Sequence, residues 1–397
     1  MMSVWSSLVG QDDAVAKLSE AAASARAIVA SRASSAARED ARSMSHAWLI
    51  TGPPGSGRSV AARAFAAALQ CTGEEIGCGT CPGCRTTMGR TNADVLFAAT
   101  ETSIINVETA RSLVLQAQSS PSQGLWRVIV VEDADRLGEA GANALLKAIE
   151  EPPEHTVWLL CAPSPEDMIA TIRSRCRHLG LRIPTANAVA DLLVREGVAT
   201  PEVALEAARA AQSHIGLARA LAADPEMRAR RRAIVTAPAS VRSVGEAVLA
   251  ADRLLETAKA QADAQVSERN AREKAELLRQ LGMEEDERAT KASRTLIRQL
   301  EEDQKRRSKR ALTDAIDRAL IDLLAIYRDV LMTQVGGDGE LINADLADLV
   351  RSIATESTPR QTLSRVDHIE TARRRLKSNG NTLLVLEDMA ISLRPQA

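Results

Sequence analysis

The spacing of hydrophobic residues changes near residue 184, and this change separates two kinds of predicted structure. Before it, short apolar runs alternate with stretches of helical periodicity. Such short runs, rich in branched residues, are typical of strands buried on both faces of a parallel sheet. The alternation predicts an α/β domain with a parallel sheet over residues 1–183. The predicted strands are 47–50, 94–98, 127–131, 156–162 and 178–181, and the predicted helices are 12–25, 60–70, 107–117, 140–150 and 168–174.

Beyond Pro184 the strand signals stop and only helical patterns remain. The segment Thr236-Ala237-Pro238 is predicted to be a linker between a small helical domain, 184–237, and a larger one, 238–397. In the larger domain, Gly282 interrupts a strongly charged stretch at about 256–312, which predicts a hairpin of two long helices. The other predicted helices are 186–196, 201–212, 216–223, 225–235, 359–377 and 380–393.

Composition limits the classes of protein that fit. The chain has 397 residues, 45% of them hydrophobic, and a formal net charge of −2, so two or three globular domains are expected. The near-neutral balance argues against nucleic-acid binding by bulk charge. No apolar run approaches the roughly 20 residues that cross a bilayer, and the first residues do not resemble a signal peptide. We therefore expect no membrane contact and a cytoplasmic protein whose cysteines are reduced or metal-bound.

A glycine-rich segment between the first predicted strand and its helix carries the strongest functional motif. It reads G-x-x-x-x-G-R-S and differs at one position from the phosphate-binding loop G-x-x-x-x-G-K-[ST]. Such a loop would bind ATP or ADP through backbone N–H groups and the following helix N-terminus. A guanidinium places its charge differently from a lysine ammonium, while the last hydroxyl is retained for Mg²⁺. The alternative is an ordinary glycine-rich turn. The residues are Gly52, Pro53, Pro54, Gly55, Ser56, Gly57, Arg58 and Ser59.

Two acidic residues follow the predicted strand at 127–131. A nucleotide hydrolase of this kind is expected to have Asp there, for the metal, and then Glu, to activate water. Here Glu132 precedes Asp133, so the order is reversed. Asp133 is one methylene shorter than the expected general base, and geometry decides such a role before pKa does. The alternative is a solvated acidic turn.

Four cysteines at 71–84 have the spacing C-x6-C-x2-C-x2-C. Four thiolates this close suit a tetrahedral zinc site with no open position for catalysis. Iron–sulfur ligation also uses such runs, but nothing else in the chain suggests redox chemistry. We therefore expect a structural zinc module, and we assign Cys161 to the core, while Cys176 has no clear partner. The four predicted ligands are Cys71, Cys78, Cys81 and Cys84.

Several segments together resemble the AAA+ clamp-loader ATPase family of bacterial replication, over about the first 225 residues. The resemblance implies a RecA-like AAA+ domain at 1–183, a helical lid at 184–237 and a collar domain at 238–397. Arg175 matches the family's arginine finger, which acts on a neighbouring subunit's ATP; the alternative is a surface arginine at a helix end. Arg219 matches a nucleotide-sensing arginine of the lid. The segments are Val9-Gly10-Gln11, Ser45-His46-Ala47, the loop 52–59, the four-cysteine module, Leu145–Pro153 and Ser174-Arg175-Cys176.

The chain departs from the family's motor subunits at Arg58, at Glu132-Asp133 and near Pro163, where a motor has a threonine that senses γ-phosphate. The combination resembles the delta-prime branch, whose members keep the finger but have a degraded ATP site. The resemblance implies a hetero-pentamer with gamma/tau and delta, a sliding clamp and primer-template DNA. An ATP-hydrolysing motor subunit is the alternative. A third hypothesis is that the charged hairpin binds nucleic acid, although its interleaved acids favour a solvated surface or a partner contact.

Overall fold

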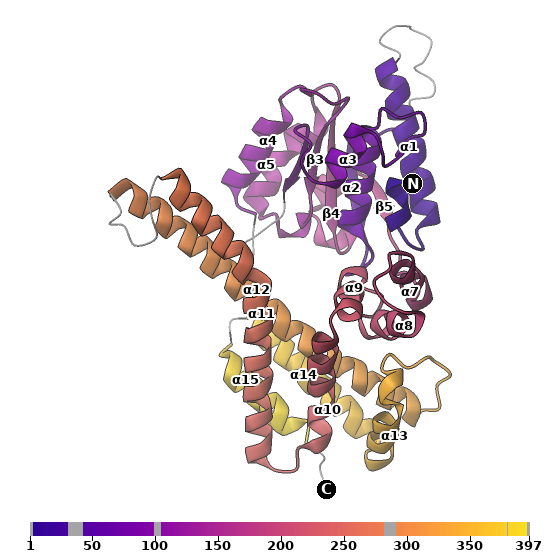
Figure 1. Ribbon diagram of the computed structural model, residues 1–397, viewed down its shortest axis with the longest axis vertical. Helices are drawn as coiled ribbons and strands as arrows, with labels where there is room; N and C mark the ends of the chain where they lie inside the picture. Colours follow the sequence, from indigo (N-terminus) through magenta and orange to yellow (C-terminus); the bar gives the residue numbers. More distant parts are fainter. Residues whose placement is uncertain (1–2, 31–42, 99–104, 282–290, 379, 395–397) are drawn as a thin grey trace. The chain divides into compact units, whose positions relative to one another are not determined.

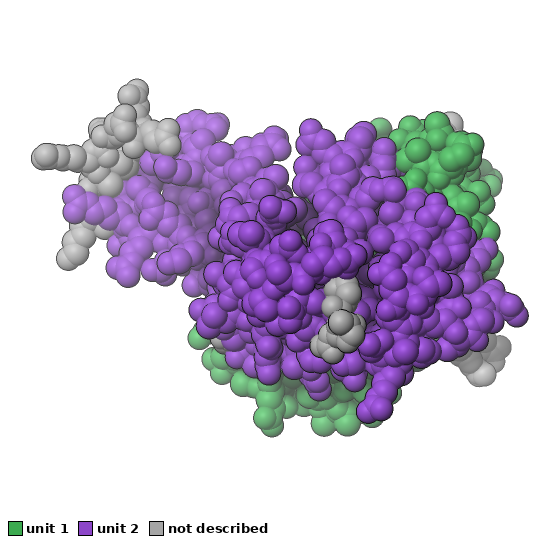
Figure 2. All heavy atoms as spheres, turned by 90° about the horizontal axis from the view of Figure 1, so that it is seen from below, with its two compact units in different colours: residues 1–219 green, residues 220–397 purple. Residues whose placement is uncertain are grey.

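The computed structural model describes residues 3–30, 43–98, 105–281, 291–378 and 380–394. It divides into two compact units, residues 1–219 and 220–397 (Figure 2). The predicted domain boundaries near 183 and 237 remain predictions.

Unit 1 is built on a five-stranded parallel sheet with the order β2-β3-β4-β1-β5 (Figure 1). The strands are parallel and β4 lies between β1 and β3. The segments that follow β1 and β3 therefore leave the same edge of the sheet, one on each side of β4. This order confirms the predicted RecA-like α/β class. The strands are β1 (Ala47–Thr51), β2 (Val95–Ala98), β3 (Arg127–Val131), β4 (Thr156–Ala162) and β5 (Arg177–Gly180).

Alternate residues of each strand enter two separate cores. On one face, Trp48 and Ile50 pack with α1 (Asp12–Ala30), α2 (Arg58–Leu69) and the cysteine module. On the other face, Leu49 and its neighbours pack with three further helices, so the sheet is covered on both sides. These helices are α4 (Val107–Ala117), α5 (Glu139–Glu150) and α6 (Ala170–Arg173).

The remaining elements of unit 1 are short. A 3₁₀ turn η1 (Val4–Ser7) precedes α1, and α3 (Pro82–Met88) lies inside the cysteine module. The turns η5 (Ala134–Arg136) and η6 (Pro165–Asp167) follow β3 and β4. The predicted helices after Pro184 are present as α7 (Ala186–Arg195), α8 (Pro201–Ala210) and α9 (Ile215–Ala223).

The described part of unit 2 is helical apart from its connections. Its core joins Leu255 of α11, Leu320 and Tyr327 of α12, Ile369 of α14 and Leu386 of α15. The prediction of an all-helical C-terminal domain is confirmed here. The elements are α10 (Pro225–Ser240), α11 (Val244–Gln280), α12 (Lys291–Gln334), η7 (Ala344–Leu346), α13 (Ala347–Glu356), α14 (Pro359–Lys377) and α15 (Thr382–Ser392).

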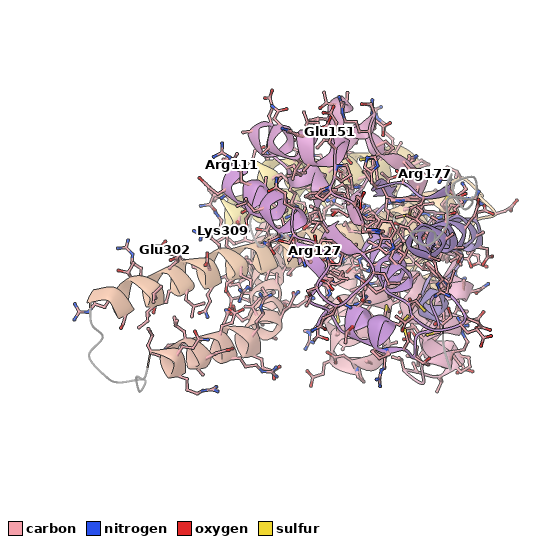
Figure 3. The ribbon with its side chains drawn as sticks, turned by 90° about the horizontal axis from the view of Figure 1, so that it is seen from above. Arg111, Arg127, Glu151, Arg177, Glu302 and Lys309 are labelled. Atoms are coloured by element: carbon pink, nitrogen blue, oxygen red, sulfur yellow. The ribbon has the colours of Figure 1, made fainter. Side chains whose placement is uncertain are left out.

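The charged hairpin consists of the paired helices α11 and α12, while the predicted break at Gly282 lies outside the described residues. Towards the hairpin tip the apolar contact shrinks to Ala262, Val266 and Ala311. Beyond these residues, Arg307 of α12 pairs with Glu273 of α11 at 2.8 Å. Glu302 and Lys309 lie along α12 (Figure 3), and Glu302 pairs with Arg298 one turn away at 3.1 Å. Such pairs neutralise the surface locally.

Three local predictions differ from the structure. The predicted linker at 236–238 lies inside α10, where Val235 is buried in the unit 2 core and Pro238 interrupts only the last turn. The segment 71–90 contains the unpredicted helix α3. The first helix runs from Asp12 to Ala30, past the predicted end at residue 25. Most of the Ala-, Ser- and Arg-rich stretch at 26–43 lies outside the described residues.

Candidate functional site

The glycine-rich loop turns sharply between β1 and α2. Gly55 and Gly57 have φ angles of 90° and 89°, a region that glycine occupies without strain. A Cβ on Gly55 would lie 2.7 Å from Cα of His214, so the loop passes close to the segment before α9. Gly57 gives α2 no side-chain cap, which suits a phosphate at that helix N-terminus. The residues present therefore fit nucleotide phosphates.

Arg58, the residue that departs from the loop motif, folds back onto its own loop. Its guanidinium donates a hydrogen bond to the carbonyl oxygen of Gly52. The other end of the turn is closed by the Ser56 N–H, which donates to the carbonyl of Pro53 at 3.0 Å. The Arg58 guanidinium thus spends one of its hydrogen bonds on the loop backbone. The ammonium of a lysine at this position would instead extend towards the phosphate.

The acidic pair and Pro163 lie at the sheet edge that carries the loop. Glu132 follows β3, Pro163 follows β4, and Gly52 follows β1, and the Gly52 N–H donates to the Pro163 carbonyl at 3.1 Å. Burial raises the pKa of Cys161, on β4 between them, to about 12. The charge of Arg58 opposes this shift and those of Glu132 and Asp133 add to it. The structure therefore brings the three predicted elements together.

Glu132 forms an ion pair with an arginine that the sequence analysis did not identify. Nη2 of Arg90 lies 2.5 Å from Oε1 of Glu132, and the Glu132 side chain is 13% exposed. Oδ2 of Asp133 lies 4.0 Å from Nε of Arg136. The carboxylate at the predicted metal position is thus already paired with a cation. It is therefore a poorer ligand for Mg²⁺ than an unpaired carboxylate would be.

Arg175 lies on the surface just after α6, and its side chain is 37% exposed. It pairs with Glu150 at the end of α5, and its Nη1 donates to the carbonyl of Thr171 at 2.7 Å. Exposure and attachment to a short helix are compatible with a residue that reaches another molecule. Its action as a finger stays a prediction.

Arg219, the predicted nucleotide-sensing residue, makes a bidentate ion pair with Glu196: its Nε donates to Oε2 at 3.0 Å and its Nη2 donates to Oε1 at 2.8 Å. Its charge also contributes to lowering the pKa of Arg63, which burial and Arg90 lower more strongly. Arg219 therefore belongs to the electrostatic surroundings of α2, although its side chain is paired with Glu196 at the end of α7.

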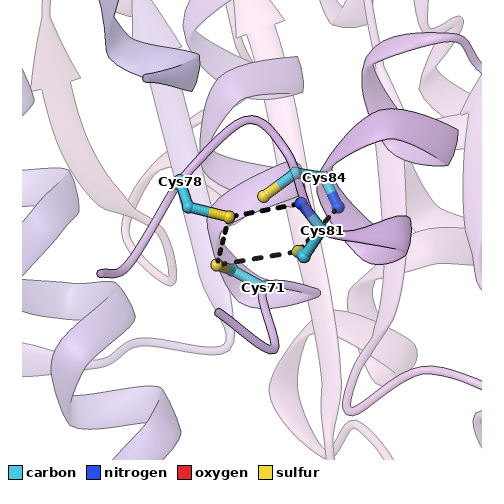
Figure 4. Close-up of side chains that lie close together, drawn as sticks. All are labelled: Cys71, Cys78, Cys81 and Cys84. Atoms are coloured by element: carbon cyan, nitrogen blue, oxygen red, sulfur yellow. Dashed lines mark hydrogen bonds between the residues drawn. The ribbon is translucent and has the colours of Figure 1, made fainter. Parts of the chain in front are cut away.

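The four predicted metal ligands come together in one cluster (Figure 4). The ligand atoms of Cys71, Cys78, Cys81 and Cys84 all lie within 4.8 Å of one another. Sγ of Cys71 lies 3.7 Å from Sγ of Cys78 and 3.9 Å from Sγ of Cys81. The edge of a tetrahedron with Zn–S bonds of about 2.3 Å is about 3.8 Å. The residues therefore fit a tetrahedral metal ion such as structural zinc.

Hydrogen bonds and burial act on these thiols in opposite directions. Burial raises the pKa of Cys84. Burial also opposes ionisation of Cys81, but hydrogen bonds from Cys84 and Thr72 prevail and lower the pKa of Cys81 to about 6. A hydrogen bond from the Thr80 hydroxyl lowers the pKa of Cys78. Two of the ligands are thus already biased towards the thiolate that a metal requires.

Close packing fixes the module against α2. A Cβ on Gly83 would lie 2.0 Å from the carbonyl oxygen of Gln70, so only glycine fits there. Arg26 of α1 donates to the carbonyls of Cys71 and Glu74 at 2.9 and 3.0 Å. The module therefore shares the core of unit 1 instead of standing apart from it.

Sequence reasoning missed two residues that shape the site and gave a third, Gln11, no specific role. Arg90 pairs with Glu132, His214 contacts the loop, and Gln11 donates to the carbonyls of Ser56 and Arg182 at 3.3 and 2.6 Å. Gln11 was recognisable within the Val9-Gly10-Gln11 motif. The other two have no local signal because their partners are far away in the chain.

Comparison with known proteins places the chain in a family. A model described as "DNA polymerase III, delta subunit" matches residues 30–185, and one described as "DNA polymerase III, delta subunit, C terminal" matches residues 287–394. The gamma/tau subunit of Mycobacterium bovis DNA polymerase III is 35% identical over 162 residues, 39% of this chain and 28% of that protein. The Escherichia coli K12 delta' subunit is 34% identical over 180 residues, 44% of this chain and 54% of that protein.

A solved structure, a gamma subunit-related protein from Thermotoga maritima, aligns over 69% of this chain and 95% of its own, with 18% identity and a TM-score of 0.37. That score carries no weight in the assignment. The chain spans about half or less of the length of the two relatives named above. No helix in the described part of the chain combines the length and apolar character that a membrane crossing needs. Since two delta-subunit models together cover more than half of it and a delta' subunit is among its relatives, this chain belongs to the delta-prime branch of the DNA polymerase III clamp-loader subunits.

Proposed function

We propose that this chain is a structural subunit of a replicative clamp loader and supplies Arg175 to the ATP site of a neighbouring gamma/tau subunit. The observation that carries the proposal is the exposed Arg175 in Ser174-Arg175-Cys176, on a chain whose own loop and acidic pair are altered. In the transition state of ATP hydrolysis, a guanidinium in this role stabilises charge on the transferred phosphate.

The chain's own site supports little or no intrinsic ATPase activity. Arg58 is bonded to the loop carbonyl of Gly52, and Glu132 is paired with Arg90. Asp133 is too short for the position that should activate water. Loss of these contributions leaves a phosphate-binding loop without the groups that drive hydrolysis.

The family membership supports a set of partners. We propose a cytoplasmic hetero-pentamer with gamma/tau and delta subunits that helps to load a sliding clamp onto primer-template DNA. In that assembly the bound zinc ion would hold the four-cysteine module folded, with Cys71, Cys78, Cys81 and Cys84 as ligands. The charged hairpin, with its internally paired surface, fits a solvated or partner-contacting element.

The finger role is tested by Arg175→Ala in a reconstituted complex with gamma/tau and delta. Arg173→Ala is the matched control, because Arg173 is an exposed arginine two residues earlier, at the end of α6. We expect Arg175→Ala to lower the DNA-stimulated ATPase rate of the complex by about 10³, and the control to leave it unchanged. An unaffected rate in the Arg175 variant, in a complex that still assembles, would rule out the finger role.

A steady-state ATPase assay of the isolated chain separates this proposal from the alternative of a motor subunit. We expect no turnover above background. Robust turnover that disappears in Ser59→Ala would show that the loop hydrolyses ATP, and the chain would then be a motor.

A further inference from the structure

The ion pair between Arg90 and Glu132 occupies the position at which a nucleotide hydrolase holds its metal. Glu132 follows β3 beside the phosphate loop, its side chain is 13% exposed, and Nη2 of Arg90 lies 2.5 Å from its Oε1. A divalent cation approaching this carboxylate would have to displace a guanidinium. Since one positive charge already neutralises the carboxylate, the attraction that would draw Mg²⁺ to it is reduced.

Backbone geometry and ring contact position Arg90, whose side chain is 42% exposed. Its φ angle is 59°, a left-handed conformation that a non-glycine residue adopts only when its surroundings impose it. Its N–H donates to the carbonyl of Thr87 at 3.0 Å, just after α3, and its guanidinium lies 4.9 Å from the centre of the Phe97 ring. The same helix α3 carries Cys84 and begins after Cys81. The cysteine module therefore positions Arg90.

A second guanidinium adds to the positive charge beside the loop. Arg63 lies on α2, four residues after Ser59, and thus on the same face of the helix. Its Nε is buried and has no hydrogen-bond partner in the described structure. Burial lowers the pKa of Arg63, and the nearby charges of Arg90 and Arg219 lower it further, while Glu132 opposes them. Within this group Glu132 pairs with Arg90 and Glu196 pairs with Arg219, which leaves Arg63 as the cation whose repulsion from the other two a bound anion would relieve.

We propose that Arg90 takes the place of the divalent cation at Glu132, so that the loop Gly52–Ser59 binds nucleoside di- or triphosphates without Mg²⁺. Arg63 contributes the additional positive charge that phosphate groups require. In a site that depends on Mg²⁺, the metal bridges the phosphate oxygens and neutralises their charge. Here Arg90 neutralises Glu132, and Arg63 together with the backbone N–H groups of the loop offsets the phosphate charge. The proposal concerns this chain's own loop, so it can fail while the action of Arg175 on a neighbour stands, and the reverse.

The test is titration of the full chain with a fluorescent ADP analogue, in MgCl₂ and in EDTA at equal ionic strength. We expect the dissociation constant of the unmodified protein to change by no more than about twofold between the two conditions, since no charge contact is lost. Arg90→Gln exposes Glu132 to the metal, and its affinity should then rise by about tenfold or more when Mg²⁺ is added. Arg90→Lys keeps the charge and should remain independent of Mg²⁺.

Arg85→Ala is the control, because Arg85 is an exposed arginine on the same helix α3. It should behave like the unmodified protein. Three results would overturn the proposal: a loss of about tenfold or more in the unmodified protein's affinity on removal of Mg²⁺, no measurable binding of the analogue in either condition, or an Arg90→Gln variant that folds and binds equally well with and without Mg²⁺.

Discussion

Asp94, just before β2, is predicted to be one of the most sensitive polar positions of unit 1. Its side chain is 1% exposed in the ion pair with Arg127. Oδ1 accepts hydrogen bonds from the N–H and the hydroxyl of Ser122, at 2.6 and 2.9 Å. Oδ2 accepts from the N–H groups of Gln123 and Gly124, at 2.8 and 2.6 Å. One carboxylate thus fixes the loop that leads into β3, the strand that ends at Glu132.

The cost of Asp94→Asn follows from this geometry. Each oxygen faces two donors, so the new NH₂ group must oppose donors in either orientation. At the Oδ1 position it opposes only the Ser122 N–H, because the hydroxyl can rotate and accept. One orphaned buried N–H costs about 1–3 kcal/mol, and the two bonds that remain lose about 1 kcal/mol each when the acceptor is no longer charged. The total is about 3–5 kcal/mol, or on the order of 10 °C in the Tm of this unit.

Tryptophan fluorescence can measure this change in the whole chain, because all four tryptophans lie in unit 1. Urea unfolding followed by this signal gives the free energy of unfolding of that unit. Asp191→Asn, at an exposed position on α7, should change it by less than about 0.5 kcal/mol. A loss below about 1 kcal/mol for Asp94→Asn would refute the reasoning, because the donors would then have found other partners.

The pH dependence gives the same prediction an independent check. Burial acts to raise the pKa of Asp94, but the N–H groups of Ser122, Gln123 and Gly124 prevail and lower it below its ordinary value. A carboxyl whose pKa is lowered on folding stabilises the protein above its unfolded pKa, and that contribution is lost as the pH falls further. The difference between the unmodified protein and Asp94→Asn should therefore be constant at neutral pH and shrink below about pH 4.

Two further predictions concern the metal centre and the finger. Metal analysis should give about one zinc per chain, and Cys81→Ser should release it because a closed tetrahedral site needs all four thiolates; iron with a visible chromophore would contradict the assignment. Glu150→Ala removes the partner of Arg175, but both side chains are about two-fifths exposed, and such pairs contribute about 0.2–1 kcal/mol. The ATPase rate of the complex should then change by about fivefold at most, and a fall as large as that of Arg175→Ala would mean that Glu150 itself positions the finger.

Where the physical signal is local, the sequence predicted the structure well. The strands at 127–131 and 156–162 were predicted residue for residue, because buried parallel strands are short apolar runs that helices cannot imitate at that length. The helix Val107–Ala117 was predicted with its observed bounds, and the structure adds that the Asn106 side chain caps it by accepting from the Thr109 N–H. The cysteine cluster could be predicted because its ligands lie close together in the chain as well as in space.

The sequence failed where tertiary contacts override a local preference. Thr236-Ala237-Pro238 has the composition of a linker, yet the burial of Val235 keeps α10 helical through it. The partner of Glu132 was equally hidden, because Arg90 lies 42 residues away and nothing in its neighbours marks it. Only the parallel pairing of β2 with β3 brings the end of the cysteine module to the acidic pair.

The reversed order of Glu132 and Asp133 gains a physical meaning from this arrangement. Considered alone, it is a defect that removes a metal ligand and shortens a base. In the structure, the longer side chain at the first position is the one that reaches Arg90, while the shorter one at the second position lies near Arg136. The exchange therefore places the longer carboxylate where it pairs with Arg90. Under the proposed function, we expect such a site to lose hydrolysis before phosphate binding, because the loop's backbone N–H groups and the N-terminus of α2 do not depend on either acid.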